Sequence, residues 1–342
     1  MFRSAEPVIA SGSTIAVTGV SGFIGSHTAD KLLEAGYLVH GITRDREKNG
    51  WIAAFFDKKY GEGKFKLFQV QDFTSENGLD EPFHGVSGVI HVGSDMSFGP
   101  DPNAVIPVTV ATTLAVFRAA AQNPGVKRFV LTSSCAATTS PKVGRYPTIT
   151  SQSWNDEAIQ EAWAEPPYNP ERGFTVYAAS KTLAEKEAWS WMENTSPAFV
   201  LNTVLPSANF GKSLDVAHQD HPSTSGLIKA LYLGNHEAVM AASEYFYIDV
   251  EDTARLHLAA LLHPDLKSRR IFAYAEPYTW KSIQDVLRSV YADKVFAPDI
   301  PDHPLDRSII AELPLSLQLL KDMGRDGWSS LEDIVRANTA DL

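Results

Sequence analysis

The stretch TIAVTGVSGFIGSHTADKLLEAG, residues 14–36, joins an apolar strand-like run to a helical repeat through a glycine-rich turn. The turn has the pattern TGxxGxxG, with Gly19, Gly22 and Gly25 at its three fixed positions. The first glycine permits a tight bend, the second lets the backbone approach a pyrophosphate, and the third permits close contact between helix and strand. Because the pattern stands at the first strand–helix junction, it predicts a dinucleotide site at a helix N-terminus and not an incidental turn.

Outward from this stretch, strands and helices alternate through the first two thirds of the chain. Further apolar strands are expected at residues 37–43, 65–71, 87–93, 127–134 and 198–206, with helices at 22–36, at 103–122 and around Tyr177. Strands that are apolar on both faces and separated by helices are typical of a parallel sheet covered on both sides. The sequence therefore predicts an α/β fold with a Rossmann-type, doubly wound parallel sheet.

A change of composition after Pro206 indicates a second region. Residues 207–226 are rich in Ser, Gly, His and Asp, as in a loop, and a strand and a helix follow at 245–262. The last 70 or so residues mix short helices with the segments 269–275 and 328–338. We expect a dinucleotide-binding domain at 1–206, to which 245–263 returns, and a smaller, interleaved substrate-binding lobe that takes up most of 207–342.

Composition limits the classes of partner. The 342 residues carry 30 basic and 41 acidic side chains, a net charge of −11, which disfavours a nucleic-acid partner. The single cysteine, Cys135, cannot form an internal disulfide and fits a reducing compartment. We find no signal-peptide pattern and expect no window near the roughly 18 apolar residues of a membrane span. A cytoplasmic protein without a membrane partner is expected, as a monomer or a homodimer.

The end of the second strand bears on the choice of dinucleotide. An NAD site usually has an acidic residue there for the ribose hydroxyls, but this strand ends in His40-Gly41-Ile42-Thr43-Arg44. Arg44 is a planar donor suited to a 2′-phosphate, and Lys48 follows closely. The alternative is a solvated basic turn, in which Asp45 offsets part of the charge. The pattern favours NADPH/NADP+ as the cofactor.

Other cofactor contacts are expected where the strands end, because ligands of open α/β sheets bind there. Asp72 is expected near the adenine, and Val92 and Gly93 near the adenosine ribose and the pyrophosphate. The full set expected from the glycine loop and strand ends is Gly19, Ser21, Gly22, Phe23, Ile24, Gly25, Arg44, Lys48, Asp72, Phe73, Val92, Gly93, Ser94 and Thr132.

The segment VYAASKTLAEKEAW, residues 176–189, places Tyr177 and Lys181 four positions apart on one helical face, with Thr175 as the expected N-cap. A tyrosine has a pKa near 10, and a neighbouring cation would lower that pKa towards the range of a useful proton donor. Two amphipathic side chains at a helix edge are the alternative. Tyr60 and Lys64 have the same spacing in a glycine-containing loop, so the spacing alone is weak evidence.

A third element supports a catalytic site. The strand at 127–134 ends in Thr132, Ser133 and Ser134, whose hydroxyls are expected at the carboxyl end of the sheet, where ligands bind. Capping of the following turn is the alternative role for such a strand end. Taken together, the glycine loop, the serines and the Tyr–Lys pair predict a catalytic constellation.

With these motifs the sequence resembles the extended short-chain dehydrogenase/reductases, nearly from end to end. VTGVSGFIGSH, KRFVLTSS, VYAASKTLAEKEAW and YIDVEDTARLHLAAL look most like microbial NADPH-dependent aldehyde and ketone reductases, which are similar to plant dihydroflavonol reductase. The resemblance implies that Ser134 is the catalytic serine and Tyr177 the proton donor. It implies that Lys181 binds the nicotinamide ribose and lowers the tyrosine pKa.

The same resemblance implies that Tyr177 and Lys181 also contact the cofactor, and that Pro206, Ser207 and Ala208 touch the nicotinamide. The chain departs from the family at one point. The usual Gly-Thr-x-Asn of the central helix reads Thr112-Thr113-Leu114-Ala115, so the asparagine contact is lost.

The function expected from these features is the NADPH-dependent reduction of an aldehyde or ketone to the alcohol. A sugar-nucleotide dehydratase would have an acid pair after the strand serine, where this chain has Cys135-Ala136-Ala137. An epimerase would need basic side chains for a diphosphate, and residues 207–226 offer only Lys212. A regulator that binds NADP without turnover would tend to lack the tyrosine or the lysine, and both are present.

Other candidate groups have plainer alternatives. His218 and His221 form an HxxH in a polar loop and are expected to be solvated, with no metal bound. Cys135 has no histidine beside it, so a nucleophilic role is not expected. A set of large apolar side chains could either shape a substrate pocket or belong to the core: Met96, Phe98, Trp154, Phe210, Tyr245 and Phe246.

Overall fold

Seven short segments that are apolar on both faces form one parallel sheet in the computed structural model, which describes residues 6–142 and 144–342. The strands are β1 (Thr14–Thr18), β2 (Leu38–Thr43), β3 (Phe65–Gln69), β4 (Val86–His91), β5 (Arg128–Thr132), β7 (Val200–Pro206) and β10 (Arg270–Ala273). Their order is β10-β7-β5-β4-β1-β2-β3, and every neighbouring pair is parallel. The chain winds outward from β1 in both directions, which confirms the predicted doubly wound Rossmann-type sheet.

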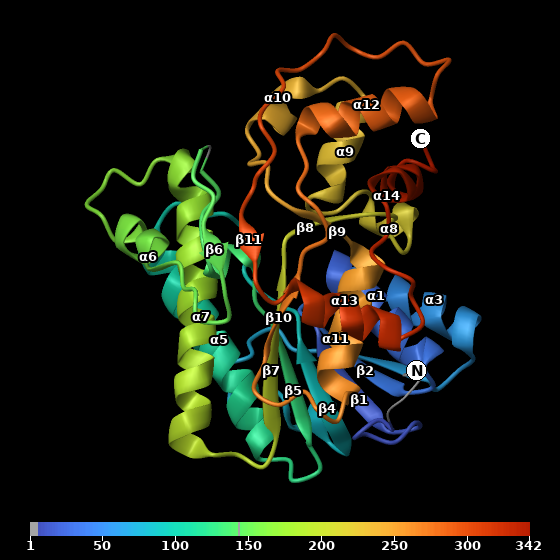
Figure 1. Ribbon diagram of the computed structural model, residues 1–342. Coiled ribbons are helices and arrows are strands. Elements are labelled where there is room, and N and C mark those ends of the chain that lie inside the picture. Colours follow the sequence, from blue (N-terminus) through green and yellow to red (C-terminus); the bar gives the residue numbers. More distant parts are fainter. Residues whose placement is uncertain (1–5, 143) are drawn as a thin grey trace.

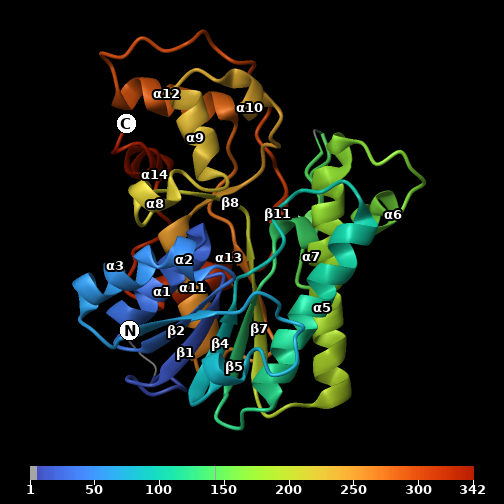
Figure 2. The same ribbon diagram turned by 180° about the vertical axis from the view of Figure 1, so that it is seen from behind.

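Helices cover both faces of the sheet (Figures 1 and 2). On one face lie α1 (Phe23–Glu34), α3 (Trp51–Tyr60), α11 (Val250–Leu262) and α13 (Leu313–Asp322); on the other lie α4 (Asp80–Phe83), α5 (Pro102–Ala121) and α7 (Gly173–Thr195). Side chains of a strand alternate between the faces. In β1, Ile15 and Val17 pack into the core of the first face and Ala16 into the core of the second.

A smaller lobe stands beyond the carboxyl ends of the strands (Figure 1). It contains β8 (Ala208–Phe210), β9 (Tyr247–Asp249), α8 (Val216–Gln219), α9 (Ser225–Tyr232), α10 (His236–Met240), α12 (Trp280–Val290) and α14 (Leu331–Asn338). Phe210 and Trp280 are buried in its separate apolar core. The lobe lies at the end of the sheet where the predicted cofactor and catalytic residues emerge.

The remaining elements complete the connections between the lobes. They are α2 (Arg46–Asn49), the 3₁₀ turn Cys135–Ala137, β6 (Thr148–Ile149), α6 (Asp156–Ala162), the 3₁₀ turn Pro170–Arg172 and β11 (Ile309–Ile310). β6 follows β5 in the chain, yet it pairs in parallel with β11 from the C-terminal region. This pairing ties the insertion between β5 and α7 to the end of the chain.

One predicted placement was wrong, and a second was right only in part. Residues 269–275 were assigned to the C-terminal lobe, but Arg270–Ala273 forms β10 at the edge of the main sheet, beside β7. The strand at 247–249 pairs with β8 in a separate two-stranded sheet, but its Ile248 packs with α11 in the main core, so the predicted return of 245–263 is right for the core and wrong for the sheet. Both strands are short and apolar, so their pattern shows that they are buried but not which sheet they join.

Smaller differences concern element ends and hydropathy. The strand predicted to reach Ser134 ends at Thr132, and α7 begins at Gly173 after the N-cap Arg172, so Thr175 lies inside the helix and is not its cap. The expectation of no long apolar window was wrong for α5. This helix has 20 residues and a mean hydropathy of 1.7, which is long and apolar enough to cross a membrane. Val116 and Phe117 of α5 pack in the core beneath the sheet, as in a core helix of a globular domain.

Candidate active site

The glycine loop between β1 and α1 is closely packed. Gly19 has φ +64°, and a Cβ on it would lie 2.8 Å from the backbone of Gly93, which follows β4. A Cβ on Gly25 would lie 2.1 Å from the carbonyl oxygen of Gly19. Gly22 is the N-cap of α1 and supplies no side-chain cap, which leaves first-turn N–H groups for another acceptor. The loop therefore has the shape and the polarity that a dinucleotide pyrophosphate requires.

Residues predicted at the adenosine end lie on the surface beyond β2 and β3. Arg44 is exposed, and its side chain has no hydrogen bond or ion pair with any residue that the structure describes. Asp45 caps α2 by accepting the backbone N–H of Lys48 at 2.9 Å. Asp72 accepts the backbone N–H and the hydroxyl of Thr74, and these hydrogen bonds hold its pKa below the usual value. Arg44 is thus free for a ligand, whereas one oxygen of Asp72 is already occupied.

The segment after β4 adds a polar group without a partner. The Ser94 hydroxyl is buried and finds no hydrogen-bond partner within residues 6–142 and 144–342. The N–H of Gly93 donates to the Thr18 hydroxyl at 3.1 Å, which ties this segment to β1. Val92 and Phe73 are partly buried against the two main cores. An orphan hydroxyl in the segment that packs on the glycine loop fits a polar ligand bound there.

The carboxyl end of β5 meets the first turns of α7. Lys181 is buried, and its Nζ donates to the carbonyl oxygen of Thr132 at 2.8 Å. Ser134 lies just beyond the strand, and its Oγ accepts the N–H of Ala136 at 3.1 Å, so it also has the capping role considered as the alternative. The Ser134 hydroxyl lies near enough to the half-buried Tyr177 phenol to work towards a lower tyrosine pKa. The structure thus brings the three predicted catalytic residues to one end of one strand.

The protonation of this group differs from the prediction. Burial raises the pKa of Tyr177 to about 12, with the nearby Ser134 hydroxyl working in the opposite direction. Burial lowers the pKa of Lys181 to about 8, and the nearby Glu185 carboxylate works against that shift. The expected lowering of the tyrosine pKa by Lys181 is therefore wrong for this structure, where the ammonium binds the Thr132 carbonyl. At neutral pH the phenol holds its proton.

Aromatic side chains flank the phenol on its open side. The Phe98 ring lies 5.0 Å from the Tyr177 ring and the Phe174 ring 6.1 Å from it, and both are more than a third exposed. Phe98 was one of the candidate pocket residues. Phe174 was missed, although its position three residues before Tyr177 on the helix was the available signal. Both rings give this side of the site an apolar wall.

The other candidate pocket residues divide into surface and core. Met96 is exposed beside Phe98 in the chain, and Phe210, Tyr245 and Phe246 are buried. The Arg270 guanidinium lies over the Trp154 ring, with its Cζ 3.9 Å from the ring centroid. These positions assign packing roles to four of the candidates: Phe210, Tyr245, Phe246 and Trp154.

The nicotinamide end predicted by resemblance lies where β7 passes into β8. Pro206 ends β7, and the Ser207 hydroxyl donates to the Phe246 carbonyl at 2.7 Å. The Thr132 hydroxyl contacts Nε2 of His257 on α11 at 2.7 Å.

Burial raises the pKa of the Cys135 thiol, which disfavours a thiolate at neutral pH.

The segment 211–221 of the smaller lobe lies against the glycine loop. Gln219 Nε2 donates to the Ser21 carbonyl and the Ser26 hydroxyl, both at 3.1 Å. His218 stacks on Trp51 of α3 with ring centroids 5.2 Å apart, and His221 contacts the Asn338 carbonyl at 2.9 Å. The two histidines considered as metal ligands therefore have separate packing roles.

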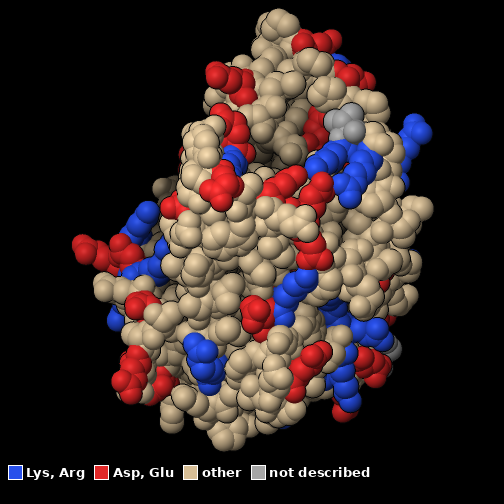
Figure 3. Space-filling model, turned by 90° about the vertical axis from the view of Figure 1, so that its left-hand side faces the viewer, with Lys and Arg blue, Asp and Glu red and all other residues tan. Residues whose placement is uncertain are grey.

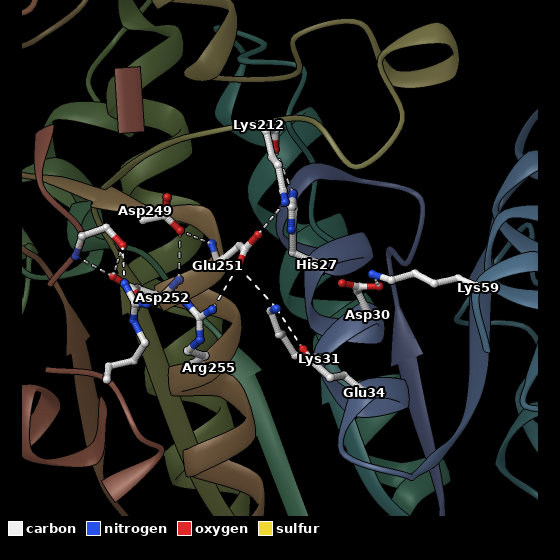
Figure 4. Close-up of polar contacts among 12 residues, drawn as sticks. His27, Asp30, Lys31, Glu34, Lys59, Lys212, Asp249, Glu251, Asp252 and Arg255 are labelled. Atoms are coloured by element: carbon white, nitrogen blue, oxygen red, sulfur yellow. Dashed lines mark hydrogen bonds and ion pairs between the residues drawn. The ribbon is translucent and has the colours of Figure 1, made fainter. Parts of the chain in front are cut away.

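A charged cluster fixes the same segment to α1 and α11 (Figure 4). The Lys212 carbonyl oxygen lies 2.9 Å from His27 Nε2, and the Lys212 ammonium lies 3.1 Å from the Glu251 carboxylate. Glu251 also pairs with Lys31 at 3.3 Å and with Arg255 at 2.9 Å. The helix that begins at the glycine loop is thus held against α11 by one shared carboxylate.

A cavity of about 190 Å³ opens between the insertion after β5 and the smaller lobe. Its lining includes Lys142 and Tyr146 from the insertion and Met240, Glu244 and His303 from the lobe. Figure 3 shows the surface hollowed on this side of the molecule, below the top of the lobe. The hollow lies at the end of the sheet that carries the candidate catalytic residues.

Comparison with known proteins assigns the family. Residues 15–273 match the model of the NAD dependent epimerase/dehydratase family, and the chain belongs to this family as an extended short-chain dehydrogenase/reductase. It is 37% identical to aldehyde reductase 2 of Sporidiobolus salmonicolor over 98% of each chain, and 34% identical to ketoreductase adrE of Penicillium rubens over 97% of each. These relatives identify the chain as an oxidoreductase.

A solved structure is similar over nearly the whole length. Gre2 of Candida albicans in complex with NADPH superimposes with a TM-score of 0.82 at 25% identity, covering 96% of this chain and 98% of that one. The yeast methylglyoxal/isovaleraldehyde reductase Gre2 gives a TM-score of 0.78 at 23% identity, which shows the shared fold.

Proposed function

We propose that this protein reduces an aldehyde or a ketone to the alcohol with NADPH. The observation that carries the proposal is the meeting of Ser134, Tyr177 and Lys181 at the end of β5, with a phenol whose pKa of about 12 keeps it protonated. Relatives named as aldehyde reductase and ketoreductase support the reaction class, and the neighbour solved with NADPH supports the cofactor.

The cofactor would lie across the carboxyl ends of the strands. The glycine loop would bind its pyrophosphate, the Ser94 hydroxyl a polar group nearby, and the free Arg44 guanidinium the 2′-phosphate. Lys181 would bind the nicotinamide ribose from the floor of the site. When bound, NADPH supplies the hydride that reduces the carbonyl carbon.

The protein's own groups would handle the oxygen and the proton. The Ser134 hydroxyl would hold the substrate carbonyl oxygen beside the Tyr177 hydroxyl. As negative charge develops on that oxygen, Tyr177 would transfer its proton to it. Phe98 and Phe174 would exclude water from one side. We propose that substrates enter through the hollow between the insertion after β5 and the smaller lobe.

Mixing the purified protein with NADPH and a panel of aldehydes, ketones and β-ketoesters tests the proposal through loss of reduced-nicotinamide absorbance. We expect turnover with NADPH, and we expect Tyr177→Phe to lose about 10²–10⁴-fold in kcat while still binding NADPH. Turnover at the native rate by this variant would contradict the assigned proton donor.

The same panel separates the alternative. The family also contains epimerases and dehydratases, and a relative from Aspergillus terreus, 36% identical, is named NAD-dependent epimerase/dehydratase terH. Conversion of a nucleotide sugar without net consumption of NADPH would favour that chemistry. The sequence Cys135-Ala136-Ala137, where a dehydratase would have acids, argues against it.

A further inference from the structure

One fully buried carboxylate lies directly behind the candidate active site. Glu185 is on α7, one turn after Lys181, and is 1% exposed. Its Oε2 accepts the Ser133 hydroxyl at 2.6 Å, and its Oε1 accepts the Thr203 hydroxyl at 2.8 Å. The Arg270 guanidinium donates to Oε1 at 2.8 Å through Nε and to Oε2 at 3.0 Å. Glu185 thus joins α7 to β5, β7 and β10.

The guanidinium of this pair is itself fixed. Arg270 donates to the carbonyl oxygens of Ser151 and Ser153 at 3.1 and 2.7 Å, and its plane lies over the Trp154 ring. Burial works to raise the pKa of Glu185, but Arg270 and the hydroxyl donors outweigh it and hold that pKa below the usual value. The carboxylate therefore stays ionised at neutral pH, with a defined orientation.

The same helix face holds the end of β5 twice. Lys181 binds the carbonyl of Thr132, and Glu185 binds the hydroxyl of the next residue, Ser133. The residue after these two is Ser134, whose hydroxyl lies near the Tyr177 phenol. A shift of Ser133 would therefore move the serine that is to hold the substrate.

Among the titratable groups around Lys181, Glu185 is the one whose charge favours the ammonium form of the lysine. His91 on β4 is fully buried, and burial lowers its pKa to about 3, so it is neutral. Burial lowers the pKa of His257 on α11, which contacts Thr132, to about 4. Tyr177 is protonated. Arg270 on β10 pairs with Glu185. The negative charge of Glu185 opposes the effect of burial on the Lys181 pKa.

We propose, on the basis of the proposed reductase function, that Glu185 is a positioning residue: its buried carboxylate fixes Ser133 so that Ser134 faces Tyr177, and it maintains the positive charge of Lys181. The variant that tests this is Glu185→Gln, which keeps the shape and removes the charge. A buried ion pair that loses one partner is strongly destabilised, so the double variant E185Q/R270M, which leaves no buried charge unpaired, is measured beside it.

The readout is the pH dependence of kcat with NADPH and the best carbonyl substrate. An ammonium in a buried site loses its proton at a lower pH when its anionic neighbour is removed. We expect the alkaline limb, near pH 8 in the native protein, to move about one pH unit towards acid in both variants, a tenfold change in the proton concentration at the midpoint.

Two controls separate charge from packing. Thr203→Val removes one hydrogen bond to Glu185 but keeps its charge, and Arg270→Met removes the partner but keeps the carboxylate. The alkaline limb should not move towards acid in either of these two variants. A limb at its native position in E185Q, or in the double variant where E185Q does not fold, would overturn the inference while leaving the reductase proposal intact. Absence of carbonyl reduction by the native protein would instead refute the proposed function itself.

Discussion

Replacing Gly25 by alanine tests how closely the glycine loop is built around its ligand. The added Cβ would lie 2.1 Å from the Gly19 carbonyl oxygen and 3.1 Å from the Cα of Val20, whereas ordinary contacts begin at 3.4 Å. Both neighbours are backbone atoms, so no side chain can rotate away. The start of α1 must move from the turn by about 1 Å, a displacement of the size that can cost about 10²-fold when it moves binding groups.

We therefore expect Gly25→Ala to raise the Kd for NADPH by about 100-fold, equivalent to about 2.8 kcal/mol. Titration of NADPH fluorescence measures the Kd, and thermal unfolding followed by circular dichroism shows whether the variant is folded. Gly22→Ala is the graded comparison, because its Cβ would lie 3.3 Å from the same oxygen, and its effect should be much smaller.

Gly327→Ala is the neutral control, since a Cβ there meets nothing within 4 Å. A folded Gly25→Ala protein that binds NADPH within twofold of the native affinity would refute the reasoning. It would mean either that the pyrophosphate does not bind at this turn or that α1 can shift without moving its N–H groups.

Arg44→Ala should raise KM for NADPH about tenfold to 100-fold through loss of a charge-assisted hydrogen bond and leave KM for NADH unchanged; equal changes for both cofactors would contradict the 2′-phosphate contact. Asp249→Asn should remove a pH-dependent loss of stability. Burial raises the pKa of Asp249 to about 7 from an ordinary 3.8, so in the native protein the carboxylate destabilises the fold increasingly as the pH rises from about 4 to 7. Asparagine can still cap α11, so urea unfolding at pH 5 and pH 8 should show that the variant gains stability relative to the native protein at the higher pH; an unchanged difference would refute this. Phe117→Ala should lower the free energy of unfolding by about 3–5 kcal/mol, because its ring is fully buried 4.1 Å from that of Phe129, while the exposed Val108→Ala should change it by less than about 0.5 kcal/mol in the same urea titrations; equal losses would contradict the burial argument.

The sequence was sufficient for features whose signals are local. The glycine turn, the alternation of strands and helices and the Tyr177–Lys181 spacing each lie within a few turns of chain, and the sheet followed from them. Parallel strands end at the same edge, so the proximity of Ser134 to that pair could also be predicted.

Features set by distant parts of the chain could not be predicted. Glu185 and Arg270 are 85 residues apart, and neither has a neighbouring residue that indicates the other. The i, i+4 spacing places Lys181 near Tyr177 but cannot show that its ammonium turns to the Thr132 carbonyl. The tyrosine pKa depends mainly on burial, which the packing of several elements decides together.

The route of the chain through the sheet sets the point in synthesis at which a native molecule can first exist. β10 joins the edge of the sheet only after the chain has passed through β8, β9 and α8 to α10 of the smaller lobe, and α11, which packs against β4, β5, β7 and β10, comes from the same late part of the sequence. A nascent polypeptide that has emerged only as far as residue 206 has α1 and α3 on that face of the sheet but lacks α11 and α13, so the side of the face that these two helices cover is exposed. Until the ribosome has released the residues beyond 273, shielding of that side must come from outside the chain.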